Sequence, residues 1–201
     1  MDYLQSFSLR DFLIFSPESY FKLFELSNKT LWPLHIPLVL LAIIALVLLY
    51  KRQHFASRVI LVWLGLVWAF VGYSYFRVYY SQIATYAQSI SYALWAEACL
   101  LFLYAFFANH ESINTLKVPY EKWRWTLGGG FILYGLVFHP IVSASIWDQS
   151  WVRFEIFSIA PDPTAIATIG FILLLPLRGY LLLVAIPILW LLFSIMTYQA
   201  F

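Results

Sequence analysis

Residues 160–196 decide the fold of this chain and read APDPTAIATIGFILLLPLRGYLLLVAIPILWLLFSIM. Asp162 is predicted to cap a helix, because its side chain can accept hydrogen bonds from the first backbone N–H groups and the proline after it suits the first helical turn. Pro176 and Gly179 mark a turn, and residues 180–196 form a second apolar run. The pattern predicts a helical hairpin inside a lipid bilayer.

The first limb of this hairpin is short for a membrane span. At about 1.5 Å per residue, residues 163–175 cover about 20 Å, whereas the hydrocarbon layer is about 30 Å thick. The limb therefore either stops short of one membrane face or is extended by the non-helical segment before it. Irregular backbone is not stable in contact with lipid, so we expect the rest of the chain to cover such a segment.

The composition of the whole chain fits a membrane protein. Of the 201 residues, 63% are hydrophobic and 11% are charged, whereas soluble domains carry about 25% charged residues. A water-soluble fold could not bury so many apolar side chains, so the solvent is predicted to be lipid. The net charge of +2 is scattered along the chain without a basic stripe, which argues against nucleic-acid binding.

We therefore predict an all-α, polytopic membrane protein with about six transmembrane helices and an N-terminal amphipathic interfacial helix. Residues 1–30 mix apolar and charged side chains, and Ser16-Pro17 is typical of a helix start. This segment is predicted to lie on the membrane surface or, equally, to pack on a partner. Residues 31–201 are predicted to form the bundle, and residues 145–160 within it are placed at the interface. The predicted spans are residues 31–50, 59–76, 83–109, 125–143, 163–175 and 180–196.

The distribution of lysine and arginine predicts the orientation, because short inner loops are enriched in these residues. One predicted side carries seven of them: Lys51, Arg52, Arg58, Lys117, Lys122, Arg124 and Arg178. The other side carries five: Arg10, Lys22, Lys29, Arg77 and Arg153. We therefore expect both termini outside and the turn of the hairpin inside.

Glu97 is the first candidate functional residue. It falls near the middle of the third predicted span, where an ionisable side chain costs at least about 2.5 kcal/mol. It could serve as a proton or ion site, with Tyr134 and Trp68 at similar depth as hydrogen-bond donors. Alternatively, Glu97 is a protonated acid that hydrogen-bonds within the bundle or reaches the interface. No second carboxylate shares its predicted depth, so neither an acid–base pair nor a metal site is predicted.

His35 and His139 form the one suggestive pair of histidines. Both are predicted about one turn inside the outer face, on different spans, and two histidines at equal depth could ligate a haem iron. The simpler interpretation is that each histidine hydrogen-bonds near the interface. Haem is therefore the weaker alternative, and no other cofactor is predicted.

Arg77 is the remaining candidate, because it lies near the predicted outer face among several tyrosines. It could contact a lipid head group or another anion, or it could simply extend to the interface. Three glycines at residues 128–130 are predicted to allow close helix packing. No nucleophile elbow, zincin helix or Cys-x-x-Cys motif appears, so neither a catalytic residue nor an enzyme activity is predicted.

Short motifs of proline, glycine and aromatic residues cover most of the chain from its first predicted span onward. They are Trp32-Pro33-x-x-Ile36, Ile83-Ala84, Tyr134-Gly135-Leu136-Val137, Pro163-Thr164 with Gly170, and Ile186-Pro187-x-x-Trp190. This set resembles an uncharacterised bacterial integral-membrane family, domain of unknown function 6064. The resemblance implies an inner-membrane helical protein without an assigned activity. It also implies that relatives continue beyond Phe201, which would leave one helix face here for a partner to cover. Asp162 departs from the pattern, because Cys or another small residue is expected there.

Three functions are compatible with these features. The preferred hypothesis is a structural or accessory subunit that packs among lipids and other membrane protein subunits, because the polar interior is sparse and no catalytic set converges. The second hypothesis is a transporter or channel for protons or a small solute, with Glu97 as the working carboxylate. The third and weaker hypothesis is a haem-binding electron-transfer protein that uses His35 and His139.

Overall fold

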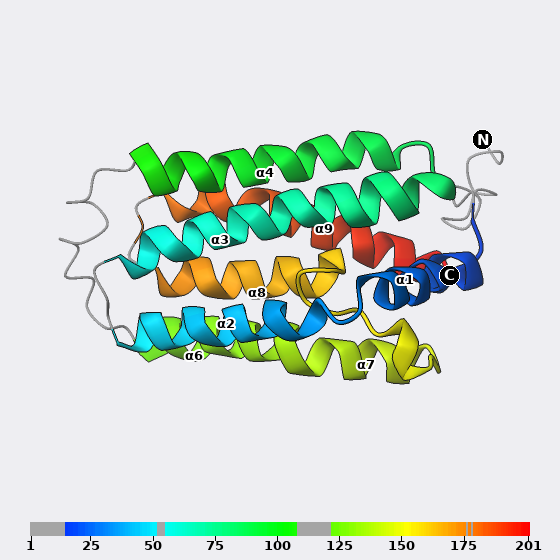
Figure 1. Cartoon of the computed structure of the whole chain (residues 1–201), viewed down its shortest axis with the longest axis horizontal. Coiled ribbons are helices and arrows are strands. Elements are labelled where there is room, and N and C mark those ends of the chain that lie inside the picture. The colour runs from blue at the N-terminus through cyan, green and yellow to red at the C-terminus, as the bar shows by residue number, and fades with distance from the viewer. Residues whose placement is uncertain (1–14, 52–54, 108–121, 176, 178) are drawn as a thin grey trace, which may run out of the picture.

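The computed structural model describes residues 15–51, 55–107, 122–175, 177 and 179–201. Every regular element among these residues is a helix, which confirms the predicted all-α fold. Figure 1 shows an elongated bundle in which most helices run along the long axis. The exception is α1 (Pro17–Leu31), whose axis is bent 89° from that of the helix after it.

Within the described parts of the chain, four helical segments are long and apolar enough to cross a membrane. Each overlaps a predicted span. They are α3 (Ala56–Val71) with η3 (Gly72–Tyr79) and η4 (Tyr80–Gln82), α4 (Ala87–Phe107), α6 (Lys122–Leu133) with η5 (Tyr134–Phe138) and α7 (His139–Ile146), and α9 (Tyr180–Gln199).

The N-terminal region forms two helices rather than one helix and a full span. α1 begins after Ser16, whose hydroxyl accepts a hydrogen bond from the Ser19 N–H at 3.2 Å, so the predicted helix start is confirmed. The span predicted to begin at residue 31 begins instead with α2 (His35–Tyr50), which has 16 residues. The bent pair α1–α2 counts as a fifth candidate span only when its two helices are taken together.

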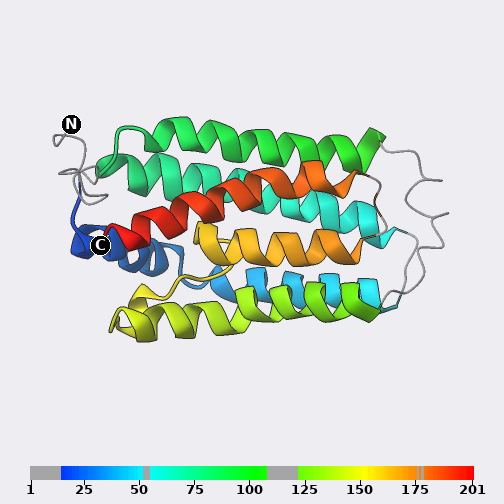
Figure 2. The same cartoon turned by 180° about the vertical axis from the view of Figure 1, so that it is seen from behind.

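The fifth predicted span, residues 163–175, corresponds to α8 (Pro161–Leu174), which has 14 residues and is too short to be counted by length. Figure 2 shows α8 in the middle of the bundle, between α9 and α6, and most of its side chains are buried. The predicted cap at Asp162 is wrong. Ala160 occupies the N-cap position without a side-chain hydrogen bond, and Asp162 lies in the first turn with its side chain bonded to α9 instead.

Close backbone contact between α6 and α8 explains how α8 can be covered so fully. A Cβ atom at Gly170 would lie 2.6 Å from the Gly128 carbonyl oxygen, and one at Gly135 would lie 2.7 Å from the Pro163 carbonyl oxygen. Only glycine permits such an approach. The packing role predicted for residues 128–130 is confirmed for Gly128, whereas the next two glycines have no neighbour within 4 Å.

The segment before α8 is folded into the protein. Glu155 and residues 157–160 are buried by other parts of the protein, and the interfacial position predicted for residues 145–160 stays a prediction. Ser158 has a left-handed φ of 67°, and its backbone N–H donates to Thr164 Oγ1 at 2.9 Å. The short limb is therefore extended by irregular backbone that protein covers, which is one of the two arrangements expected for it.

Helix ends near the predicted inner basic residues lie together at one end of the bundle. The end of α2, the start of α3, the end of α4 and the start of α6 all meet there, and α1 and the C-terminus lie at the opposite end (Figure 1). Lys51, Arg58 and Lys122 thus belong to one end. Four other basic residues on which the predicted orientation depends lie outside the described residues: Arg10, Arg52, Lys117 and Arg178.

Candidate functional site

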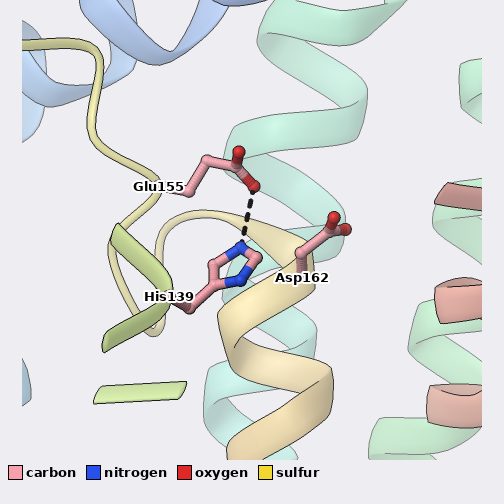
Figure 3. A group of neighbouring side chains, drawn as sticks. All are labelled: His139, Glu155 and Asp162. Atoms are coloured by element: carbon pink, nitrogen blue, oxygen red, sulfur yellow. Dashed lines mark hydrogen bonds and ion pairs between the residues drawn. The ribbon is translucent and has the colours of Figure 1, made fainter. Parts of the chain in front are cut away.

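Three ionisable side chains from three segments meet inside the bundle (Figure 3). His139 is the first residue of α7, Glu155 lies in the irregular segment before α8, and Asp162 lies in the first turn of α8. One nitrogen or carboxylate oxygen from each lies within 4.8 Å of those of the other two. Glu155 and Asp162 are only 1% and 4% exposed. We refer to these three residues as the triad.

The local sequence explains the position of His139. Pro140 has no N–H, so an ordinary helical hydrogen bond cannot form there, and the preceding η5 turn is π-helical. In this turn the His139 N–H donates to the Tyr134 carbonyl, five residues back. Such turns occur often at functional sites. Gly135 lets η5 lie directly against α8, which brings the His139 ring close to Asp162.

Glu155 accepts hydrogen bonds from three side chains on two helices, α7 and α9. Its Oε1 accepts from Tyr198 Oη at 2.8 Å and from the Ser143 hydroxyl, and its Oε2 lies 3.3 Å from His139 Nε2. Three side chains thus direct polar groups at this one buried carboxyl group.

Asp162 has donors of its own on α9. Trp190 Nε1 donates to Oδ1 at 2.6 Å, and the Ser194 hydroxyl donates to Oδ2. Among the salt bridges that join described residues, the only one that reaches Glu155 comes from His139, and none reaches Asp162. The triad thus places two acids beside one imidazole in the protein interior, where an uncompensated charge is costly.

Aromatic rings cover the triad towards the end of the bundle where α1 lies. The Tyr198 ring, whose hydroxyl bonds Glu155, is stacked on Trp147 at 5.6 Å between centroids and meets Tyr20 of α1 edge-on at 5.9 Å. Tyr20 also meets Tyr80 edge-on at 6.0 Å. The docking of α1 on the bundle is therefore part of what encloses the site.

The triad has the chemistry of a cation site and of a proton site. Imidazole nitrogen and carboxylate oxygen are common ligands of transition-metal ions. The same groups form proton relays inside membrane proteins. The donors from α7 and α9 fix the orientation of both carboxylates, and such supporting hydrogen bonds accompany the ligands of most protein metal sites.

Glu97 lies apart from this network. It is 0% exposed, and neither of its carboxylate oxygens has a hydrogen-bond partner among the described residues. Trp68 Nε1 donates to Thr168 Oγ1 at 3.0 Å instead, and Tyr134 is 37% exposed on η5 with its ring beside His139. The donors expected for Glu97 therefore do not reach it, and its role as a proton or ion site stays a prediction.

The two histidines predicted as a pair have different partners. His35 Nε2 lies 3.3 Å from Asn28 Oδ1, and Asn28 Nδ2 in turn donates to two backbone carbonyls just before Glu155. His139 faces Glu155. Each histidine is thus hydrogen-bonded, in agreement with the simpler interpretation, and haem ligation by the pair stays a prediction.

Arg77 is exposed on η3. Its guanidinium carbon lies 5.9 Å and 5.7 Å from the ring centroids of Tyr92 and Trp95 of α4, a cation–π arrangement. The nearby Tyr75 and Tyr80 turn into the core. The predicted contact of Arg77 with a lipid head group or anion stays a prediction.

Sequence reasoning found His139 but neither of the acids beside it. Glu155 lies in a segment that also carries the exposed Asp148 and the surface ion-pairing Arg153, so composition gave no sign of its burial. Asp162 precedes Pro163 and has the pattern of a helix cap. The signal that could have found Glu155 is its apolar surroundings, since Phe154 and Ile156 flank it.

The family comparison agrees with the motifs. A model described as a family of unknown function, DUF6064, matches residues 17–201. The chain belongs to this family. The match begins at the first residue of α1, earlier than the motifs, which begin at Trp32. Comparisons with curated proteins and with solved structures gave no match. The function of this DUF6064 member therefore has to be argued from its own residues.

Proposed function

We propose that this protein is a transporter of the bacterial inner membrane that moves a cation in exchange for protons. The observation that carries the proposal is the burial of Glu155, Asp162 and Glu97 without a lysine or arginine salt bridge among the described residues. A buried carboxylate is costly unless a cation or a proton neutralises it. Ionisable residues inside a membrane accordingly mark pathways for ions and protons.

The proposed arrangement has six membrane-embedded segments. Five are α2, the α3–η4 segment, α4, the α6–α7 segment and α9. The sixth is α8, with the covered segment before it completing the crossing. α1 lies on the outer surface, and both termini are outside. The clustering of basic helix ends at the other end of the bundle supports this orientation.

The buried acids are staggered along the bundle. α4 and α9 run antiparallel, and Tyr104 Oη donates to the Gly179 carbonyl at 3.4 Å. Glu97 lies seven residues before Tyr104 in α4, and Ile186 lies seven residues after Gly179 in α9. Because the two helices are antiparallel, Glu97 and Ile186 lie at about the same depth in the bundle. The two donors to Asp162 come four and eight residues later on α9, about 6–12 Å nearer to the outer end. A cation or proton that leaves the triad would therefore meet Glu97 further inside.

Polar groups lie at intermediate depth between the two sites. Thr168 follows Asp162 by six residues on α8, is buried, and accepts the hydrogen bond from Trp68. Pro187 lies inside α9 and has no N–H, so the Leu183 carbonyl lacks its helical donor. Backbone carbonyls without a helical donor bind coupling cations where the helices of transporters unwind, and the Leu183 carbonyl supplies such an acceptor at this level.

Flux through liposomes tests this proposal. Vesicles that contain the purified protein and a trapped pH indicator are placed in a solution of Na⁺, Mg²⁺ and Zn²⁺ at constant pH. Exchange makes the lumen alkaline as cations enter and protons leave. We expect Glu97→Gln to lower the rate to that of protein-free vesicles, because an amide cannot carry the proton.

The matched control is Asp148→Asn, which removes an exposed acid at a backbone φ of 48° that asparagine adopts as readily. This variant should keep the wild-type rate. A Glu97→Gln rate equal to that of the wild type would remove Glu97 from the mechanism. A wild-type rate equal to that of empty vesicles would remove transport.

An accessory subunit is the second candidate function. The observation that favours it is the uncovered face of the α6–α7 segment, where the large apolar side chains Leu127, Phe131, Leu133, Val137, Phe138 and Ile141 are exposed. Lipid or a partner subunit would cover this face. Mass measurement in mild detergent discriminates between the two, since an accessory subunit should leave its native membrane in a larger assembly and a self-sufficient transporter should not.

A further inference from the structure

We infer that the transported cation is a divalent first-row transition-metal ion, represented by Zn²⁺, and that His139, Glu155 and Asp162 are its protein ligands. The inference names the cargo of the proposed transporter and rests on that proposal for the movement of the ion. Binding of the ion to the triad can be tested separately.

The distance between His139 and Glu155 is the first argument. Nε2 and Oε2 lie 3.3 Å apart, whereas a charge-assisted hydrogen bond measures about 2.7–2.9 Å. In a tetrahedral site with metal–ligand bonds of about 2.0 Å, neighbouring ligand atoms lie about 3.3 Å apart. The separation therefore fits a metal ion between the nitrogen and the oxygen. The ligand atom of Asp162 lies within 4.8 Å of both. A movement of the Asp162 carboxylate by about 1.5 Å would bring its oxygen to the same separation and place three ligands around the ion.

The ligand types are the second argument. Na⁺, Mg²⁺ and Ca²⁺ prefer oxygen ligands alone, whereas one imidazole with carboxylates suits Zn²⁺ and its first-row neighbours. Three protein ligands leave a position open, as in zinc sites that exchange their fourth ligand. Ser158, between Glu155 and Asp162 in the sequence, has a buried hydroxyl without a hydrogen-bond partner in the described chain. It is an unused oxygen on the same segment.

The charge of the site is the third argument. Two carboxylates and a neutral imidazole carry a charge of −2, and no lysine or arginine salt bridge among the described residues offsets it. A divalent ion held by all three groups makes the site neutral, which favours its binding in a buried position. Metal ligands must be deprotonated to bind, so proton release is required by the binding step itself.

Zinc binding in detergent tests the inference on the full chain. Protein stripped with a chelator is titrated with Zn²⁺ alone in weak buffer at pH 7, and bound metal and released protons are measured together. We expect one Zn²⁺ per chain, with protons released as the ion binds. Co²⁺ in place of Zn²⁺ should give the strong visible absorption of a four-coordinate site.

Variants locate the ion. Glu155→Gln and Asp162→Asn remove one ligand each while keeping side-chain shape, and they should weaken Zn²⁺ binding by more than the roughly 10–100-fold that loss of a supporting hydrogen bond costs. Asp148→Asn should bind as the wild type does. One Zn²⁺ per chain bound as tightly in both ligand variants as in the wild type would overturn the inference. The absence of Zn²⁺ binding or of proton release in the wild type would overturn it too, and this second result does not depend on the folding of any variant.

The inference and the transport proposal fail differently. Zn²⁺ binding at the triad with no flux in vesicles would keep the site and remove transport. Proton exchange that runs in Na⁺ and Mg²⁺ without Zn²⁺ would keep transport and overturn the metal as cargo. Exchange that requires Zn²⁺ and is lost in Glu155→Gln would support both.

Discussion

The triad and Glu97 differ in how their buried carboxyl groups are surrounded by hydrogen-bond donors. Around the triad, two helices, α7 and α9, supply the donors to both carboxylates. Glu97 is equally buried in α4, and no described residue bonds to it. Polar satisfaction stabilises a fold, whereas a lone buried polar group destabilises it. The triad should therefore contribute to stability, and Glu97 should be retained for a reason other than stability.

The largest effect that separates the two regions is expected for Glu155→Ala. This change leaves His139, Ser143 and Tyr198 as buried donors without their acceptor, and breaking a buried charge pair costs about 3–5 kcal/mol. Urea unfolding in detergent micelles, followed by circular dichroism, measures the loss. Glu155→Gln keeps an acceptor oxygen and should lose clearly less. Equal and small losses in both variants would mean that the network adds no stability.

The opposite sign is expected for Glu97→Leu. Leucine has a similar volume and no polar atoms, so it removes the desolvation penalty of a carboxyl group that has no partner. The free energy of unfolding should rise by about 1–3 kcal/mol. The same unfolding assay measures the gain, and vesicles should show that exchange is lost. A destabilised Glu97→Leu would show that Glu97 has a partner in the folded protein, which would end the contrast with the triad.

The contrast also separates what the sequence could predict from what it could not. Apolar runs predicted the positions of the helices, since α4 and α9 lie where the pattern places them, although other ends differ, such as the start of α2 at His35. The burial of Glu97 followed from its position in such a run. These are local properties, and hydrophobic periodicity reports them directly.

The triad depends on contacts that no local pattern carries. Asp162 has the same sequence signature whether it caps α8 or turns towards α9, and Trp190 and Ser194 decide between the two. Glu155 is buried because Gly135 lets η5 lie against α8, and the π-helical turn before Pro140 then places His139 and Ser143 of α7 beside Glu155. Predicting the site therefore required the arrangement of three segments, and the sequence offered only His139.

A smaller effect tests whether the donors to the triad matter for its function as well as for stability. Ser194→Ala removes one hydrogen bond to Asp162 and leaves every proposed metal ligand in place. Such supporting bonds change metal affinity by about 10–100-fold, and we expect the dissociation constant for Zn²⁺ to rise by about tenfold. Ser145→Ala is the matched control, because the Ser145 hydroxyl bonds only to the Ile141 carbonyl on the exposed side of α7. Affinity unchanged in both variants would assign Ser194 to packing alone.

The smallest effect concerns the surface ion pairs of α1, which encloses the triad from outside. Glu25 accepts hydrogen bonds from Lys29 at 2.7 Å, Lys22 at 3.0 Å and Arg153 at 3.2 Å. Lys29 first, and then Lys22, lower the pKa of Glu25 from 4.5 to about 2. Because the folded pKa is the lower one, the stabilisation is complete above about pH 4.5 and disappears as the pH falls through about 2.

The melting temperature should therefore decline between pH 4.5 and 2 less steeply in Glu25→Gln than in the wild type, and added salt should reduce the difference, because exposed pairs are screened. Asp148→Asn should keep the wild-type slope. Since Arg153 precedes Glu155 by two residues, loss of these pairs should also loosen the aromatic cover of the triad. Faster exchange of bound Zn²⁺ at neutral pH in Glu25→Gln than in the wild type would connect the surface pairs to the buried site, and identical rates would confine these pairs to anchoring α1.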